Sequence, residues 1–178
     1  MILVRLKTNK EDNYMNQQEI FDCMYALTKE KYDICKAEAE NIGENRPTER
    51  GALQLRAGIY DMAINAGFLS GTKQAMGLMS KRFGKLVAHF PELCSYYQGL
   101  SKEERVIMEI ALYPEVFLRL NFRETYNADL ADVEKDGDPQ KIFKAKIKKE
   151  VLDEVLDMWR KFRVQNDLFA FAFEDRDE

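Results

Sequence analysis

The chain has 178 residues, of which 46% are hydrophobic and 33% charged, and its formal net charge is −4 at pH 7. This length suits a single domain that buries most of its apolar surface without cross-links. Its three cysteines contain no C-x-x-C pair, which argues against a disulfide framework or a four-thiolate zinc site and predicts reduced thiols in a cytoplasmic protein. The apolar run from Ile2 to Val4 is too short for a signal peptide, and no stretch approaches the ~20 apolar residues of a membrane span.

The first two helices are predicted from capping residues and apolar spacing. Asn16 followed by Glu19 forms a capping pair, and apolar residues recur on one face from there to about Asn41. After a glycine and a proline, Thr48 is expected to cap a second helix. Gly67 is expected to end that helix in the left-handed conformation that glycine adopts at little cost.

The middle of the chain predicts shorter helices that begin or end at prolines. Either Ser70 or Thr72 can cap a third helix, which Pro91 would close. Pro91 can itself open a short helix, with Gly99 as its stop.

A further helix is predicted after Ser101, which forms a second capping pair with Glu104. Pro114 is expected to separate this helix from the next one, because proline lacks the N–H group that a helix interior needs. The acidic and polar residues 129–138 are expected to form a turn region.

The longest predicted helix spans residues 139–165, with Asp138 as its cap and Pro139 at its first position. The apolar row of this helix contains Phe143, Ile147, Val151, Val155, Met158 and Phe162. Residues 166–178 alternate large apolar residues with alanine and then become acidic, so they are expected to form a packed tail or to dock on another chain.

Together these elements predict an all-α helical bundle of about seven helices with a helix-turn-helix-like corner. We expect a helical domain over residues 1–138, with the corner at about 48–90. The amphipathic helix 139–165 and the acidic tail 166–178 follow it.

Charge is strongly segregated along the chain. Residues 45–89 hold seven basic and two acidic side chains, residues 139–165 carry a net charge of +4, and the remaining segments are acidic. A basic island in an acidic chain favours contact with nucleic acid or with a protein that handles it. Alternatively, the basic segments pair with acidic segments inside the fold, and the sequence leaves both alternatives open.

The run DMAINAGFLSGT, residues 61–72, resembles the turn between the second and third helices of TetR-type DNA-binding domains. The resemblance implies that Thr72, Lys73 and Gln74 face the DNA groove. It also implies phosphate contacts from Lys81, Arg82 and Lys85, which follow this element. Arg50 and Arg56, which precede it in the same basic segment, are further candidates for binding nucleic acid or a partner.

A second basic run lies at the start of the long helix. Lys141, Lys144 and Lys148 share one face at helical spacing, so they could follow a phosphate backbone. A solvated helix face is the alternative interpretation.

Other chemistry has little support in the sequence. Residues 132–143 resemble a calcium loop superficially, but Phe143 stands where a bidentate glutamate is needed, so no metal is expected. His89 is the single histidine, and although Cys94 lies five residues from it, no third group completes a catalytic set. We therefore predict a protein without enzymatic activity or a cofactor.

The sequence favours a DNA-binding regulator whose partner is duplex DNA. The alternative is an inhibitor or adaptor that binds a nucleic-acid-processing protein such as a nuclease, similar in type to anti-CRISPR proteins of phages and mobile elements. The sequence predicts no membrane partner, and a homodimer is a further alternative.

Overall fold

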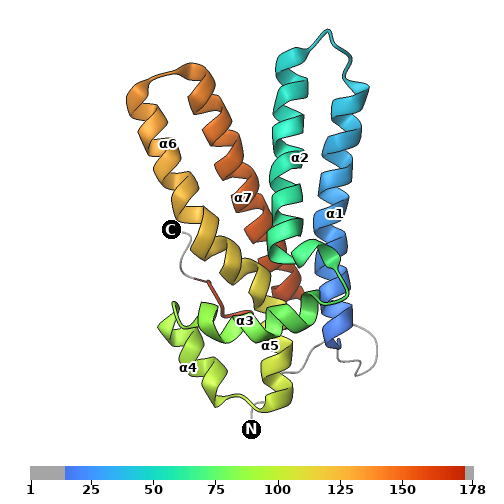
Figure 1. The fold of residues 1–178 in the computed structure, drawn as a ribbon, viewed down its shortest axis with the longest axis vertical. Helices are drawn as coiled ribbons and strands as arrows, with labels where there is room; N and C mark the ends of the chain where they lie inside the picture. The colour runs from blue at the N-terminus through green and yellow to red at the C-terminus, as the bar shows by residue number, and fades with distance from the viewer. Residues whose placement is uncertain (1–14, 175–178) are drawn as a thin grey trace.

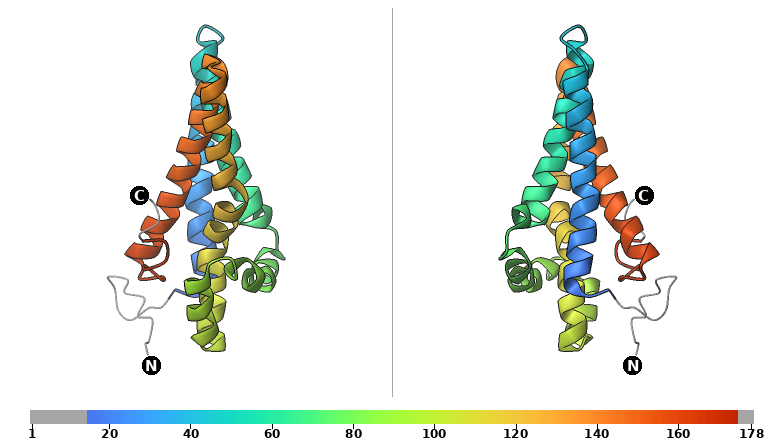
Figure 2. Two further views of the ribbon diagram at one scale, coloured as in Figure 1. Left: turned by 90° about the vertical axis from the view of Figure 1, so that its left-hand side faces the viewer. Right: turned by 90° about the vertical axis from the view of Figure 1, so that its right-hand side faces the viewer.

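The computed structural model describes residues 15–174, and the helices in that range form two arms that rise from a common base. One arm pairs α1 (Gln17–Asn41) with α2 (Pro47–Gly67), and the other pairs α6 (Glu124–Asp136) with α7 (Pro139–Gln165). The arms diverge towards their tips (Figure 1) and overlap when the molecule is turned by 90° (Figure 2). The molecule is therefore a flat V.

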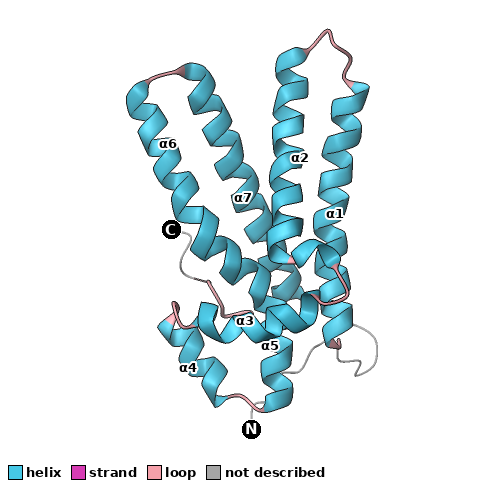
Figure 3. Ribbon diagram, viewed as in Figure 1, coloured by secondary structure: helices cyan, strands magenta, loops and turns pink. Residues whose placement is uncertain are grey.

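The base is built from α3 (Ala75–Val87), α4 (Pro91–Gly99) and α5 (Lys102–Leu118). No β-strand occurs within residues 15–174 (Figure 3), which confirms the predicted all-α class. None of the described helices combines the length and the apolar character that are needed to span a bilayer.

Several helix starts follow the predicted capping chemistry. Asn16 accepts a hydrogen bond from the Glu19 amide at 2.9 Å, and the Glu19 carboxylate accepts one from the Asn16 amide at 2.8 Å. Ser101 forms the same reciprocal pair at the start of α5. Asp138 caps α7 by accepting from two backbone amides, and α7 ends at Gln165 as predicted.

The predicted break at Pro114 is wrong. From α5 the chain runs through Pro114 and the π-helical segment η2 (Arg119–Arg123) into α6 without interruption. Residues 15–174 therefore contain six continuous helical rods, apart from the short 3-10 segment η1 (Leu69–Gly71). Pro114 is buried and lies close to Gly67 of α2, and this tertiary packing outweighs the lost backbone hydrogen bond.

The predicted turn region at 129–138 is wrong over most of its length, because α6 remains helical to Asp136. Tyr126, Leu130 and Val133 are half-buried at helical spacing and give α6 an apolar stripe. Only the end of the region turns, at Gly137, whose φ of 77° is the left-handed conformation expected of a C-terminal glycine.

The core lies where the arms join the base. Trp159 on α7 is fully buried, donates a hydrogen bond to Thr28 on α1 at 2.9 Å, and packs edge-on against Phe68. A Cβ atom on Gly67 would lie 3.1 Å from Trp159 and 3.2 Å from Pro114. Gly67 therefore permits a close helix contact and does not adopt the predicted left-handed conformation, which belongs to the next turn.

The outer halves of the arms are thinly packed in comparison. No residue in 40–56 or in 120–146 is buried, whereas α5 is almost continuously buried from Met108 to Leu118. The stability of the molecule is therefore concentrated in the base and the lower parts of the arms.

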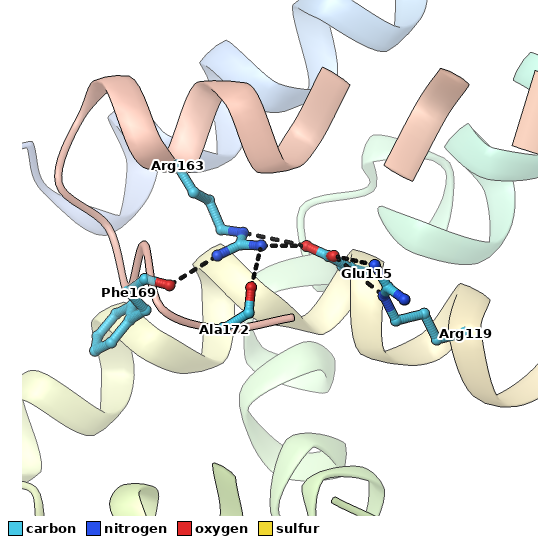
Figure 4. Close-up of polar contacts among 5 residues, drawn as sticks. All are labelled: Glu115, Arg119, Arg163, Phe169 and Ala172. Atoms are coloured by element: carbon cyan, nitrogen blue, oxygen red, sulfur yellow. Dashed lines mark hydrogen bonds and ion pairs between the residues drawn. The ribbon is translucent and has the colours of Figure 1, made fainter. Parts of the chain in front are cut away.

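A buried ionic network ties the C-terminal segment to the base (Figure 4). Glu115 accepts hydrogen bonds from Arg163 at 2.6 and 3.2 Å and from Arg119 at 3.1 Å. Arg163 also donates to the carbonyl oxygens of Phe169 at 2.9 Å and Ala172 at 3.3 Å. The described part of the predicted tail thus packs on its own chain, and residues 175–178 lie outside the described range.

Candidate nucleic-acid interface

The α3 helix divides cleanly into a buried face and a basic, exposed face. Its buried residues recur every four positions and pack mainly against α5; they are Ala75, Met79, Phe83 and Val87. Lys81, Arg82 and Lys85 are exposed on the rest of the helix, and Lys73 is exposed just before it. We call these four basic residues the α3 basic surface.

The α3 basic surface has no carboxylate partner in the described part of the chain. No ion pair involves any of its four residues within residues 15–174. The sequence itself contributes to this, since no aspartate or glutamate occurs between Asp61 and Glu92. All four charges are therefore available to an anionic ligand.

The carboxylates that α5 carries in its buried part are engaged elsewhere. Glu109 accepts a hydrogen bond from the Tyr97 hydroxyl at 2.7 Å, and Glu115 belongs to the buried ionic network. Burial, followed by this hydrogen bond to Glu109, raises the pKa of Tyr97 to about 12. The buried part of the helix under α3 thus offers no free carboxylate to neutralise the basic surface.

The turn before α3 keeps three predicted contact residues exposed. Thr72, Lys73 and Gln74 all face solvent, next to the start of α3. The predicted cap is wrong, because α3 begins after Gln74 and neither Ser70 nor Thr72 caps it with a side-chain hydrogen bond.

The backbone of this turn passes through a run of left-handed residues. Leu69, Ser70 and Gly71 have φ values of 49°, 60° and 66°. Gly71 is required there twice over, because a Cβ atom would also lie 2.9 Å from the ring of Tyr25. The close contact with α1 therefore fixes where the chain turns towards α3.

The α2 arginines do not extend the α3 basic surface. Arg56 forms ion pairs with Glu150 at 3.2 Å and Glu154 at 2.8 Å, and Tyr60 donates to the same Glu154 carboxylate at 2.8 Å. Burial alone would lower the pKa of Arg56, but the contacts with Glu154 and Glu150 outweigh it and raise that pKa. Arg56 therefore joins α2 to α7, and Arg50 is half-buried nearer the tip of α2.

The predicted lysines of α7 lie beside carboxylates. Lys141 pairs with Asp136 at 3.0 Å, and Lys144 and Lys148 line a groove together with Asp129 and Asp132 of α6. In total α6 carries five carboxylates and one lysine. Lys141 is thus paired within the fold, whereas Lys144 and Lys148 lie near the α6 carboxylates without a close ion pair in the described part of the chain.

A cleft between the arms was not predicted from the sequence. It has a volume of about 640 Å³ and lies between the outer halves of α2 and α7. Its α2 wall includes Gly51, which has no side chain, and Ala52, which has a small one. Its α7 wall includes Phe143 and Lys144. Phe143 belongs to the predicted apolar row of α7 but keeps 46% of its surface exposed, which is the signal that this part of the row lacks a partner.

The cysteines and the histidine form no reactive cluster among the described residues. Cys35 is buried, Cys94 is half-buried and Cys23 is exposed, and all three are free thiols. His89 is exposed, and no hydrogen bond joins it to Cys94 within residues 15–174. No group of three or more His, Cys, Asp or Glu side chains in that range could hold a metal ion.

The arrangement best suited to bind a ligand is therefore the open cationic surface on α3, at the base of the V. No protein-family model, curated protein or solved structure matches this chain.

Proposed function

We propose that the protein binds duplex DNA non-covalently through the α3 basic surface. One observation carries this proposal: Lys73, Lys81, Arg82 and Lys85 are exposed without a carboxylate partner in the described part of a chain whose net charge is negative. Cationic side chains that neutralise phosphates release the counterions condensed on DNA, and this release drives binding.

The shape of α3 is compatible with such a role. The helix has 13 residues, which corresponds to a length of about 20 Å at 1.5 Å per residue. With α2 and the intervening turn it would form the helix-turn-helix-like corner, and Thr72, Lys73 and Gln74 would contact the duplex beside the start of α3. Because α3 packs mainly on α5, the base would hold the helix in a fixed orientation.

The proposal is tested by comparing two triple variants with the same number of basic residues removed. Each phosphate contact is worth about a factor of ten in affinity at about 50 mM salt, so Lys81→Ala, Arg82→Ala and Lys85→Ala together should weaken duplex binding at least about 100-fold. The matched control removes Lys141, Lys144 and Lys148 of α7 and should change the affinity by less than about threefold, since these lysines already lie beside α6 carboxylates. Fluorescence anisotropy measures both.

Two results would contradict the proposal. Wild-type protein that fails to bind any duplex at low salt would remove it altogether. Equal losses in the two triple variants would show that α3 is not the contact surface.

The cleft between the arms favours a second candidate, an inhibitor or adaptor that binds a nucleic-acid enzyme. Phe143 is a large apolar side chain exposed on the wall of this cleft, and such anchors are typical of protein interfaces. Phe143→Glu should abolish recovery of such an enzyme from a bacterial lysate, whereas Val164→Glu, at a similarly exposed residue of α7 that does not line the cleft, should preserve it. If the tagged protein recovers only its own untagged copy, self-association explains the cleft better.

A further inference from the structure

We propose that the α3 basic surface recognises the sugar–phosphate backbone and does not read the base sequence, so that the protein binds duplexes of any sequence with similar affinity. This inference rests on the proposed function and specifies its ligand class.

The first turn of α3 has no side chain that could read a base. Direct readout needs hydrogen-bonding side chains near the start of a recognition helix, of which arginine, asparagine and glutamine are the most specific. The first four residues of α3 are Ala75, Met76, Gly77 and Leu78, and Ala75 is buried. None of these four side chains has a hydrogen-bonding oxygen or nitrogen atom, so the first turn of α3 cannot itself read a base, and Gln74 directly before it is the exposed amide side chain nearest to that turn.

The solvent face of α3 combines lysines with residues that have small side chains or none. Along this face the exposed residues recur at helical spacing; they are Gly77, Lys81, Gly84, Lys85 and Ala88. Apart from the local backbone of α3 itself, no atom of residues 15–174 lies within 4 Å of the position that a Cβ would take on Gly77 or Gly84. A phosphate strand can therefore approach the helix closely. Lys81 and Lys85 lie beside it, with their Cβ atoms about 5–6 Å apart as in any helical pair four positions apart.

The type of cation also favours phosphate over base recognition. Three of the four basic residues are lysines, which act as flexible point charges and lack the planar fork that reads guanine bidentately. Arg82 is the exception, but it lies about 100° round the helix axis from Lys81, at the edge of the exposed face, where it can add a phosphate contact but does not face the centre of the groove.

Two measurements on the full chain test the inference. Four phosphate contacts predict that log K falls with log salt concentration with a slope of about −3.6 on duplex DNA. Three duplexes of unrelated sequence and different base composition should bind within about threefold of one another, because phosphate contacts carry no sequence information. Both quantities come from anisotropy titrations over the range from about 50 to 200 mM salt.

Substitutions at Gly84 sharpen the test, because this position is open and a side chain there meets nothing. Gly84→Lys should steepen the salt slope by about 0.9, since it adds one phosphate contact at the centre of the face. Gly84→Glu should weaken binding at least about tenfold at about 50 mM salt. Gly84→Ala is the matched control and should leave the slope unchanged while the thermal midpoint stays equal or rises, since alanine favours a helix more than glycine does.

Failure of the inference is distinguishable from failure of the proposed function. A preference above about 100-fold for one duplex would overturn the inference in favour of a sequence-reading regulator, and DNA binding itself would stand. Equal salt slopes for Gly84→Lys and Gly84→Glu would also overturn it, because the solvent face would then lie away from the phosphates. Absence of binding to all three duplexes at low salt would remove the proposed function and the inference together.

Discussion

The lysines of α3 and those at the start of α7 are similar in sequence but meet different neighbours in the fold. In the base, α3 rests on α5, whose buried carboxylates Glu109 and Glu115 already have partners. In the α6–α7 arm, the lysines lie beside an acidic helix, and Lys141 is paired directly with Asp136. The helix that a basic segment packs against thus determines whether its charge remains available to a ligand.

The same two regions differ in how their charges contribute to stability. The base holds Glu115 and Arg163 fully buried and hydrogen-bonded, whereas the ion pairs Lys135–Asp132 and Lys141–Asp136 of the outer α6–α7 arm are largely exposed. Buried pairs are costly to break because an uncompensated charge is left inside, whereas exposed pairs contribute little. Mutations in the base should therefore have large effects on the free energy of unfolding, and mutations in the outer arm small ones.

The largest effect is expected at the centre of the base. Glu115→Ala leaves Arg163 and Arg119 without their shared carboxylate, so it should lower the free energy of unfolding by about 3–5 kcal/mol. Glu103→Ala, at an exposed position of the same helix, should lower it by no more than about 1 kcal/mol. Urea unfolding followed by circular dichroism measures both, and similar losses would show that the buried network is not what holds the base together.

Two glycines of α2 compare the base with the arm directly. Gly67→Ala places a methyl group 3.1 Å from Trp159 and should destabilise the protein by about 1–3 kcal/mol through overpacking. Gly58→Ala lies on the same helix with nothing within 4 Å and should stabilise it by about 0.5–1 kcal/mol. Thermal unfolding should therefore give shifts of opposite sign, and two shifts of the same sign would contradict the close contact at Gly67.

An intermediate effect is expected where α2 meets α7. Burial alone would raise the pKa of Glu154, but hydrogen bonds from Arg56 and Tyr60 outweigh it and lower that pKa below the usual value of 4.5. Because 42% of the Glu154 side chain is exposed, solvent screens the pair and Glu154→Gln should cost only about 1 kcal/mol at neutral pH.

The pH dependence of this effect has a definite sign. A folded pKa below the unfolded one means that the carboxylate stabilises the protein fully above the unfolded value and loses this contribution as pH falls through the folded value. The stability difference between wild type and Glu154→Gln should therefore be constant above about pH 6 and shrink below about pH 4. A difference that grew on acidification would contradict the ion pair with Arg56.

The smallest effect is expected in the outer arm. Lys144→Ala with Lys148→Ala should change the free energy of unfolding by less than about 0.5 kcal/mol, because the lysines form no close ion pair in the described part of the chain and α6 and α7 expose most of their charged side chains to solvent. High salt should remove even this difference. A loss above about 2 kcal/mol in urea unfolding would show that the arm depends on charge pairing as strongly as the base does.

Local chemistry made several helix boundaries predictable. The capping pairs at Asn16 and Ser101 and the Asp138–Pro139 start lie where the sequence placed them, because a cap depends only on residues within one turn. The predictions of a helix break at Pro114 and of a left-handed conformation at Gly67 are wrong for the opposite reason. Each residue contacts a helix far away in the sequence, and no local pattern reveals that contact.

The candidate interface was predictable only in part. The absence of acidic residues around Lys81 to Lys85 is visible in the sequence, and so is the spacing of Lys141, Lys144 and Lys148. Which basic run has carboxylates next to it depends on the pairing of α3 with α5 and of α6 with α7. The ion pairs of Arg56 join residues 94 or more positions apart and could not be foreseen.

The join between the first helix and the last also bears on how the protein is made. The hydrogen bond from Trp159 to Thr28 links residues 131 positions apart, and Arg163 holds the carbonyl oxygen of Ala172. The N-terminal helices leave the ribosome first, so Thr28 cannot form its hydrogen bond with Trp159 until most of the chain has been synthesised. The nascent α1 and α2 can pack on each other as they emerge, but the apolar surface that they present to α5 and α7 stays uncovered until those helices have been made, so folding of the whole is completed late in translation or after it.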